Sequence, residues 1–241
     1  MPTLAFYLDA PMQAWGASSK YQYRETNNFP TKSGIIGMIA AAMGIDKHCP
    51  NEEKFIAPLA ELGFTAIHLP KKHSPTTRLM DFHTVGGGYD KNASLREKMS
   101  IPPKATGAPF GTVITRRSYL TDGSFAILLE GDKDTLHSIA KALTNPVWGI
   151  WFGRKTCLPA TPLTPTHGES AQEGLDQLLQ KLPDQNPIPL EQLEYQTDAT
   201  MTQLGDGTFQ QSDEPIAYGK HQGAIPTPYR SRTLCHHRPT N

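Results

Sequence analysis

The stretch DAPMQAWGASSKYQYRETNNFPTKSGIIGMIAAAMG runs from Asp9 to Gly44 and joins the first predicted strand to the first predicted helix. The apolar run LAFYL (residues 4–8) precedes it, and its length and aromatic content are typical of a buried strand. The stretch closes with GIIGMIAAAM (residues 34–43), whose small apolar residues predict a helix packed tightly on a sheet. Gly44 ends this helix, as glycine commonly does just past a helix C-terminus.

The start of this helix carries the features of a phosphate site. Thr31 or Ser33 can cap the first turn through its hydroxyl. Free backbone N–H groups and the positive end of the helix dipole favour an anion there, and Lys32 adds a positive charge. The upstream loop interleaves aromatic and cationic side chains, as unstacked bases and their phosphates require: Trp15, Lys20, Tyr21, Tyr23 and Arg24. An ordinary N-cap beside a solvated loop is the structural alternative.

The charges are balanced overall but segregated along the chain. The 23 Lys and Arg residues equal the 23 Asp and Glu residues, which argues against a free-standing nucleic-acid binder. Residues 71–117 hold nine basic and three acidic residues, whereas residues 165–214 hold one lysine and ten acids. Residues 215–241 hold four basic residues and no acid. Such a chain can present a basic face to RNA and another face to protein, although biased solvated loops are the alternative.

Length and composition indicate a cytoplasmic globular protein. The 241 residues suffice for one large domain or two small ones. No apolar run approaches the roughly 20 residues of a membrane span, and the N-terminus does not resemble a signal peptide. The three cysteines, Cys49, Cys157 and Cys235, are few and scattered, which suits a reducing compartment.

The remaining patterns predict alternating strands and helices. We expect strands over residues 64–69, 78–85, 112–120, 125–129 and 147–152, and helices over 52–62 and 132–143. The polar, proline-broken segment between the second and third of these strands cannot form a core, so we expect the two strands to be the arms of a projecting hairpin. A further helix is predicted over residues 172–182, among irregular structure with short strands.

This order of elements predicts an α+β fold class. The succession β, α, β, insertion, β, α, β is the ferredoxin-like βαββαβ order, which RRM domains also use to bind RNA. We expect residues 1–157 to form this RNA-binding domain, with the hairpin insertion at about 78–120. Residues 158–241 would form an irregular, β-rich C-terminal region packed on it.

Basic clusters suit contacts to an RNA backbone. Four of them lie at loop ends of the one predicted sheet, and a weaker fifth lies near the C-terminus: Lys20 and Arg24, Lys32, Arg116 and Arg117, Arg154 and Lys155, and then Arg230 and Arg232. Each alone is more often a solvated surface pair, but their shared placement favours one RNA-binding surface.

Metal and catalytic motifs are weak. Neither Cys49 nor Cys157 lies at a zinc-like spacing to the cluster Cys235-His236-His237, so no metal or cofactor is expected. A metal-independent ribonuclease would need an acid or base near the 2′-hydroxyl and cations for the developing charge. His83, with Arg116, Arg117 and Tyr119, could supply them if the hairpin arms pair. We interpret His83 instead as a strand residue with a structural hydrogen bond.

Several motifs resemble the CasD family, the RAMP-superfamily subunit of the type I-E CRISPR Cascade complex. They are LDAPMQAWG (8–16), RET (24–26), FPTKSGIIG (29–37), DFHT (81–84), TRRSYL (115–120) and GRKTC (153–157). The resemblance covers roughly Leu4 to Cys157. The tail around residues 213–215 and 229–232 fits more loosely, and the tip at 101–111 has no counterpart.

The resemblance implies a non-catalytic subunit that binds and caps the 5′ handle of CRISPR RNA (crRNA). Its hairpin, the thumb, would fold over that RNA beside a neighbouring backbone subunit of Cascade, and the protein would also contact the large subunit and, indirectly, target DNA. Related type I-C subunits cleave precursor RNA, which keeps a metal-independent endoribonuclease as the alternative function. The RNA-binding residues expected are Trp15, Lys20, Arg24, Thr31, Lys32, Ser33, His83, Arg116, Arg117, Tyr119, Arg154, Lys155, Arg230 and Arg232.

Overall fold

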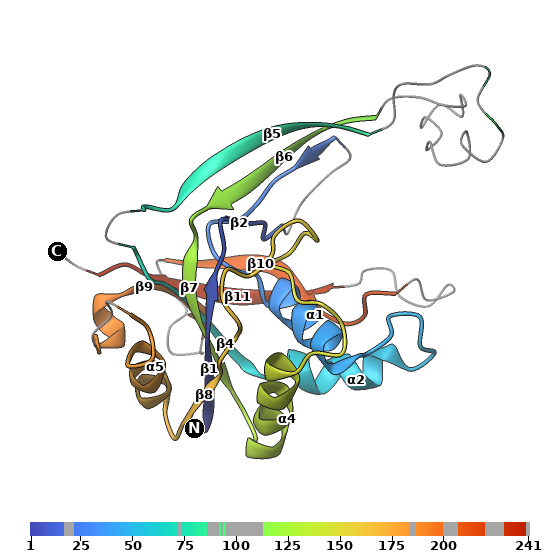
Figure 1. Ribbon diagram of the computed structural model, residues 1–241. Coiled ribbons are helices and arrows are strands. Elements are labelled where there is room, and N and C mark those ends of the chain that lie inside the picture. The colour runs from blue at the N-terminus through green and yellow to red at the C-terminus, as the bar shows by residue number, and fades with distance from the viewer. Residues whose placement is uncertain are drawn as a thin grey trace.

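The structure, a computed structural model, describes residues 1–16, 22–71, 74–85, 92, 94, 113–183, 187–199, 207–219 and 229–239. Two β-sheets and the helices around them form a mixed α+β fold (Figure 1). The helices among these residues are α1 (Lys32–Met43), α2 (Glu52–Ala60), α4 (Lys133–Thr144) and α5 (Ala171–Leu179), with a short 3₁₀ turn at Leu190–Gln192. All four helices lie where the sequence predicts them.

The larger sheet has seven strands in the order β10-β11-β9-β4-β7-β1-β8. Their bounds are β1 Thr3–Asp9, β4 Gly63–His68, β7 Ser124–Glu130, β8 Thr166–Gly168, β9 Glu194–Asp198, β10 Thr208–Pro215 and β11 Tyr229–His237. Every neighbouring pair is antiparallel. Strands from both sides of residue 157 therefore share one sheet.

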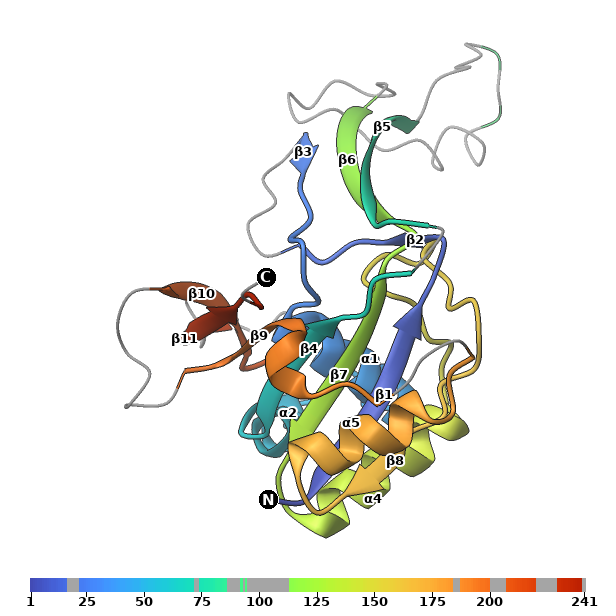
Figure 2. The same cartoon turned by 90° about the vertical axis from the view of Figure 1, so that its left-hand side faces the viewer.

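The two faces of this sheet bury different helices. Because alternate residues of a strand point to opposite faces, Leu4, Phe6 and Leu8 of β1 join the core beneath α1, α2 and α4. Ala5 belongs to a second core beneath α5. Figure 2 shows α5 on one side of the sheet and α1, α2 and α4 on the other. Both apolar faces are thus covered.

Helix α1 begins and ends as its sequence predicts. The Thr31 hydroxyl accepts a hydrogen bond from the Gly34 backbone N–H at 3.2 Å. Gly44 adopts the left-handed conformation, with φ of 73°, and its N–H donates to the carbonyls of the last turn. A Cβ at Gly34 would lie 2.9 Å from the Trp15 ring, so the glycine permits the close packing that the small residues indicate.

The predicted hairpin arms pair with one another. Strands β5 (Thr77–Val85) and β6 (Val113–Thr121) are antiparallel, in a register from Thr77 opposite Thr121 to Val85 opposite Val113. The short strands β2 (Met12–Gln13) and β3 (Tyr23–Arg24) also pair with β6. The hairpin extends away from the larger sheet (Figure 1). Its tip at 101–111 lies outside the described residues.

The strand predicted over residues 147–152 is wrong. The N–H groups of Val147 and Trp148 donate instead to the carbonyls of Ala42 and Ala41, at 2.8 and 3.3 Å, near the end of α1. The edge of β1 that this strand would occupy pairs with β8. The segment therefore runs along α1 as irregular backbone, because carbonyls of the last helical turn, which have no i+4 partner within the helix, accept its N–H groups.

Candidate nucleic-acid interface

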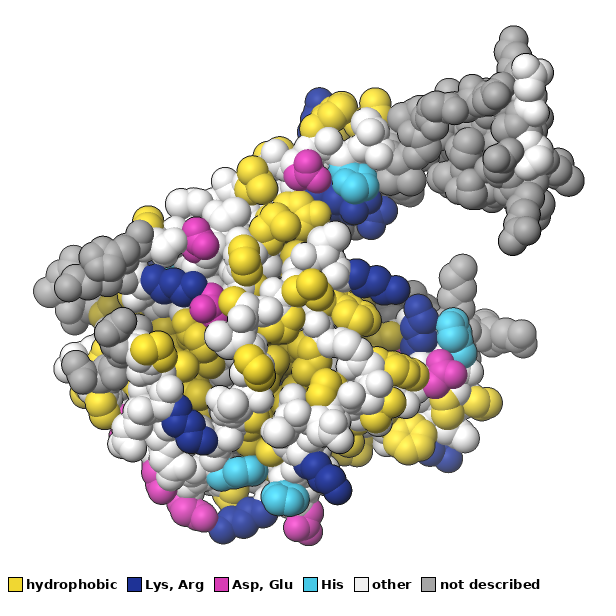
Figure 3. All heavy atoms as spheres, viewed as in Figure 1, with side chains coloured by type: hydrophobic (Ala, Val, Ile, Leu, Met, Phe, Trp, Pro, Cys, Tyr) yellow, Lys and Arg dark blue, Asp and Glu magenta, His cyan; other side chains and the backbone are white. Residues whose placement is uncertain are grey.

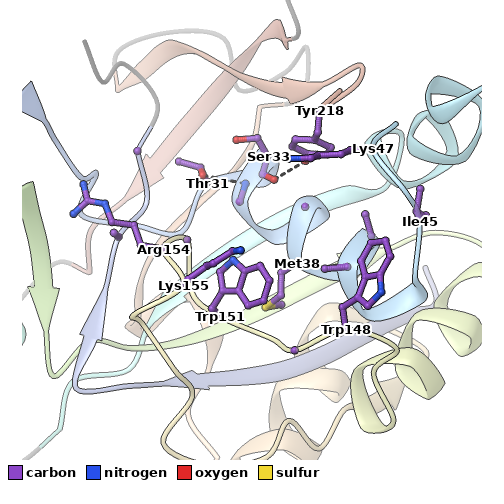
Figure 4. A pocket seen from close by; sticks show the side chains of 18 of the residues that line it. Thr31, Ser33, Met38, Ile45, Lys47, Trp148, Trp151, Arg154, Lys155 and Tyr218 are labelled. Atoms are coloured by element: carbon purple, nitrogen blue, oxygen red, sulfur yellow. Dashed lines mark hydrogen bonds between the residues drawn. The ribbon is translucent and has the colours of Figure 1, made fainter. Parts of the chain in front are cut away.

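An open groove of ≈ 580 Å³ runs along α1 (Figure 4). One side is formed by the 147–155 segment, which contributes Trp148, Trp151, Arg154 and Lys155. Thr31, Ser33, Lys47 and Tyr218 line the other side, and Gly34 and Gly37 of α1 lie between. The groove therefore combines exposed backbone with aromatic and basic side chains.

Arg154 joins the groove to the base of the hairpin. Its guanidinium donates to the Ser118 carbonyl at 3.0 Å and to the Arg24 carbonyl at 2.8 Å. It also lies 4.5 Å from the centre of the Tyr119 ring, in cation–π range. Tyr119 is buried beneath it and offers no free ring face. Arg154 thus aligns β3 and β6 with the mouth of the groove.

Gly153 sets the position of Arg154. Its φ is +89°, and a Cβ on this residue would lie only 1.8 Å from the Ala14 carbonyl oxygen. The adjacent Phe152 carbonyl accepts a hydrogen bond from the Ala14 N–H at 3.1 Å. Both the backbone angle and the close approach require glycine at this position.

Tyr218 closes the groove on the side opposite the tryptophans. Its hydroxyl donates to the Ser33 carbonyl at 2.6 Å, as Figure 4 shows. Burial raises the pKa of Tyr218 well above its usual value, and the nearby Tyr229, Glu52 and Asp213 raise it further. The phenol therefore remains a hydrogen-bond donor at neutral pH and holds this wall in place.

The hairpin carries further basic side chains. Arg116 is exposed, donates to the Tyr23 hydroxyl at 2.6 Å and lies 5.4 Å from that ring's centre. Arg117 is half-buried and donates to the Thr115 hydroxyl at 2.9 Å. Both guanidiniums retain donors for a phosphate ligand.

The residues considered as a ribonuclease site around His83 lie on two different faces of the hairpin. In the hairpin register His83 lies opposite Thr115, Asp81 opposite Arg117, and Phe82 opposite Arg116. Because directly opposed residues share a face, Arg117 lies on the face of His83 and Arg116 on the other. The His83 ring is 3.6 Å from the Asp81 carboxylate (Nδ1 to Oδ2), with its side chain 41% exposed.

Lys32 does not offer a free phosphate site at the start of α1, contrary to the sequence prediction. It is 4% exposed, and its Nζ lies 3.4 Å from the Asp198 carboxylate. Its backbone N–H donates to the Asp213 carboxylate at 2.9 Å. The anion that the helix start attracts is therefore a side chain of the same protein.

Arg232 belongs to the same buried network and is likewise unavailable to RNA. It donates to both Asp213 oxygens, at 2.6 and 2.9 Å, and to Asp198 at 2.5 Å. Burial by itself would lower the pKa of Arg232, but the hydrogen bonds and charges of Asp213 and Asp198 raise it. Two carboxylates and two cations thus link β9, β10 and β11 to α1.

Trp15 is a core residue rather than a surface for base stacking. It is 1% exposed, its indole N–H donates to the Gln13 side chain at 2.9 Å, and its ring stacks on Phe152. Arg230 is exposed, 3.9 Å from the Glu214 carboxylate. Lys20 lies outside the described residues.

The groove gathers part of the predicted set and adds residues that the sequence reasoning missed. Arg24, Thr31, Ser33, Arg154 and Lys155 all line it. The additions are Lys47, Trp148, Trp151 and Tyr218. The WGIW motif at residues 148–151 was the available signal, but assigning it to a strand of the sheet concealed its place in the groove.

Neither a metal site nor a membrane segment is found in the part of the chain that the structure describes. There, no group of three or more His, Cys, Asp and Glu side chains could hold a metal ion. His236 contacts the Glu194 carboxylate at 3.0 Å, and His237 contacts the Glu191 carbonyl at 2.8 Å. No helix among these residues combines the length and apolar character needed to cross a bilayer.

Aromatic and basic side chains along one groove are typical of proteins that bind single-stranded nucleic acid. A family model described as CRISPR-associated protein (Cas_Cas5) matches residues 3–220. The chain therefore belongs to the Cas5 family of CRISPR-associated proteins.

Individual relatives agree with this assignment. The chain is 27% identical over 165 residues to the CRISPR system Cascade subunit CasD of Escherichia coli K12, covering 66% of this chain and 68% of the relative. It resembles a chain of a CRISPR RNA-guided surveillance complex, with a TM-score of 0.65, 25% identity and coverage of 97% and 88% of the two chains. A crystal structure of a Cas protein shares the fold, with a TM-score of 0.53, 22% identity and coverage of 97% and 93%.

Proposed function

We propose that this protein is a non-catalytic subunit of a type I-E Cascade complex, in which it binds and caps the 5′ handle of crRNA. The observation that carries the proposal is the groove along α1, which joins the base of the basic hairpin through Arg154. Membership of the Cas5 family and similarity to a CasD subunit support the assignment. Such an assembly works in the cytoplasm.

The strand order supports a ferredoxin-like core for this subunit. Strands β1, β4, β7 and β8 lie side by side in the order β4-β7-β1-β8, with α1 following β1 and α4 following β7 along the chain. This is the arrangement of a split βαβ unit, with β8 in the place that the sequence assigned to residues 147–152. Helix α5 and strands β9 to β11 are additions to it.

The hairpin has the surface of a thumb that contacts both RNA and protein. Met80, Phe82 and Ile114 are 56%, 59% and 42% exposed, and the register places them on one face together with Arg116. Figure 3 shows hydrophobic and basic side chains gathered along the hairpin. The exposed apolar side chains suit contact with a neighbouring backbone subunit, whereas the arginines suit contact with the phosphates of the RNA beside it. Contact with the large subunit, and through it with target DNA, completes the proposal.

The test is to express the Cascade subunits with a CRISPR array, purify the complex and map crRNA protection with and without this subunit. We expect the 5′ handle to be protected only when the subunit is present. Equal protection in its absence would overturn the proposal.

A matched pair of variants tests the groove itself. Replacing Arg24 and Lys155, which line the groove, by alanine should weaken RNA binding and lower the log–log salt slope by about 1.4, or about 0.7 per lost phosphate contact. Lys54→Ala with Lys141→Ala removes two exposed lysines outside the groove and is the control. Identical salt slopes for the two double variants would contradict the proposed binding surface.

A further inference from the structure

The end of the groove near residue 148 is built on a fixed backbone. The N–H groups of Val147 and Trp148 are held by the carbonyls of Ala42 and Ala41. The Val147 side chain packs over Gly44, where an added Cβ would lie 2.9 Å from Val147 Cγ1. The position of Trp148 is therefore set before any ligand binds, which limits the entropy lost on binding.

This end of the groove is apolar and open. Trp148 is 44% exposed, and the apolar residues Met38, Ala41 and Ile45 also line the groove. In Figure 4, Trp148 and Trp151 lie along one side of α1, with Lys47 and Tyr218 across from them. The whole groove, of which this is one end, has a volume of ≈ 580 Å³, within the roughly 300–1,000 Å³ typical of small-ligand pockets. It suits a nucleotide better than a helix of a partner protein.

Two lysines of the groove lining, Lys47 and Lys155, can bind an anionic ligand. The Lys155 ammonium lies 5.7 Å from the centre of the Trp151 ring, and neither it nor Lys47 forms an ion pair with an acid among the described residues. The two carboxylates nearby accept backbone N–H groups of the protein itself. Glu52 accepts from Tyr218 and Gly219, each at 2.9 Å, and Asp46 accepts from His48 at 2.9 Å.

We infer that this end of the groove is a base-binding subsite. One unstacked base of a single-stranded RNA lies on the Trp148 indole, with the adjoining phosphates on Lys155 and Lys47. An exposed indole and two ammonium groups that form no ion pair among the described residues line the same groove, which matches the two parts of a nucleotide. Stacking accepts any base because every base has a π-face. The inference rests on the proposed function and adds a specific position to it.

The test uses the full chain and two synthetic RNA octamers, one of eight adenosines and one with the same backbone but abasic at every position. Fluorescence anisotropy measures binding of each octamer to the wild type, Trp148→Ala, Trp148→Phe and Phe55→Ala. Phe55, which is 53% exposed on α2 and outside the groove, controls for loss of a surface aromatic. We expect Trp148→Ala to bind the adenosine octamer about 5- to 150-fold more weakly, the range for loss of one base–aromatic stack.

The abasic octamer separates stacking from other effects. Trp148→Phe should recover most of the affinity for the adenosine octamer, Phe55→Ala should not change it, and the abasic octamer should bind Trp148→Ala and the wild type equally. Unchanged binding of the adenosine octamer to Trp148→Ala would overturn the subsite. An equal loss for both octamers would also overturn it, because the effect would then not involve a base. Failure of the wild type to bind either octamer would count against the proposed function as well.

Discussion

At the scale of single residues, Gly153 offers a sharp test of how the groove is held. The free energy of unfolding of Gly153→Ala should be lower than that of the wild type by more than about 1 kcal/mol, because a Cβ would collide with the Ala14 carbonyl. Gly207→Ala is the matched control, since Gly207 also has a positive φ, of 95°, but an added Cβ meets no atom of the described residues within 4 Å. Urea denaturation measures the stability of both variants. Equal losses of stability would show that only the backbone angle matters.

His83 provides the test of whether the protein cuts RNA. We expect no cleavage of repeat RNA by the wild type in EDTA, because Arg116 lies on the opposite face of the hairpin from His83 and arginine cannot act as a base. A real general acid or base contributes typically about 10²–10⁴-fold. A time course with wild type and His83→Ala measures this. Site-specific cleavage that His83→Ala abolishes would establish the precursor-processing alternative.

At the scale of elements, the carboxylate of Asp213 on β10 connects the C-terminal strands to α1. Its side chain is fully buried and binds both Arg232 and the Lys32 backbone N–H. Asp213→Ala leaves a buried arginine with one remaining carboxylate partner and should cost about 3–5 kcal/mol of unfolding free energy.

Glu214, the next residue in β10, provides the control. Glu214 lies 3.9 Å from Arg230, whose side chain is 72% exposed, so Glu214→Ala should change stability by no more than about 1 kcal/mol. Chemical denaturation of both variants measures the difference. If Asp213→Ala is as stable as Glu214→Ala, the hydrogen bonds and ion pairs of Asp213 contribute little to stability, contrary to this prediction.

At the scale of the whole molecule, a substitution in the exposed hairpin tests assembly separately from folding. Phe82→Ser should leave the stability of the isolated chain within about 0.5 kcal/mol, because the ring is 59% exposed. The same change should reduce co-purification with the neighbouring Cascade subunit, which we propose covers this face. Phe55→Ser, at 53% exposed on α2, is the control. Retention of the neighbour by Phe82→Ser would show that another surface makes the contact.

Local patterns were enough to predict most of the secondary structure. The apolar run at 4–8, the small-residue helix at 34–43 and the hairpin arms appear where the sequence predicts them. These elements depend on periodicity, caps and glycine positions, which neighbouring residues specify. The capping hydroxyl of Thr31 and the left-handed Gly44 are the clearest cases.

The candidate site depended much more on contacts that sequence distance conceals. Lys32 and Trp15 have the residue types of an RNA site, yet the first is paired with Asp198 and the second is packed on Phe152. Both partners lie more than 100 residues away along the chain, so no local pattern could reveal that these side chains are occupied.

By itself, the sequence determined the fold class, the order of most elements, and the motifs that resemble one CRISPR-associated family. Only the tertiary structure decided which basic and aromatic residues face solvent together. Residues 147–152 show the physical reason. Their apolar composition suits a strand. However, carbonyls of α1 accept hydrogen bonds from their first two backbone N–H groups, and β8 occupies the sheet edge. The two tryptophans therefore line the groove, because competition for hydrogen-bond partners is resolved only when the whole chain has folded.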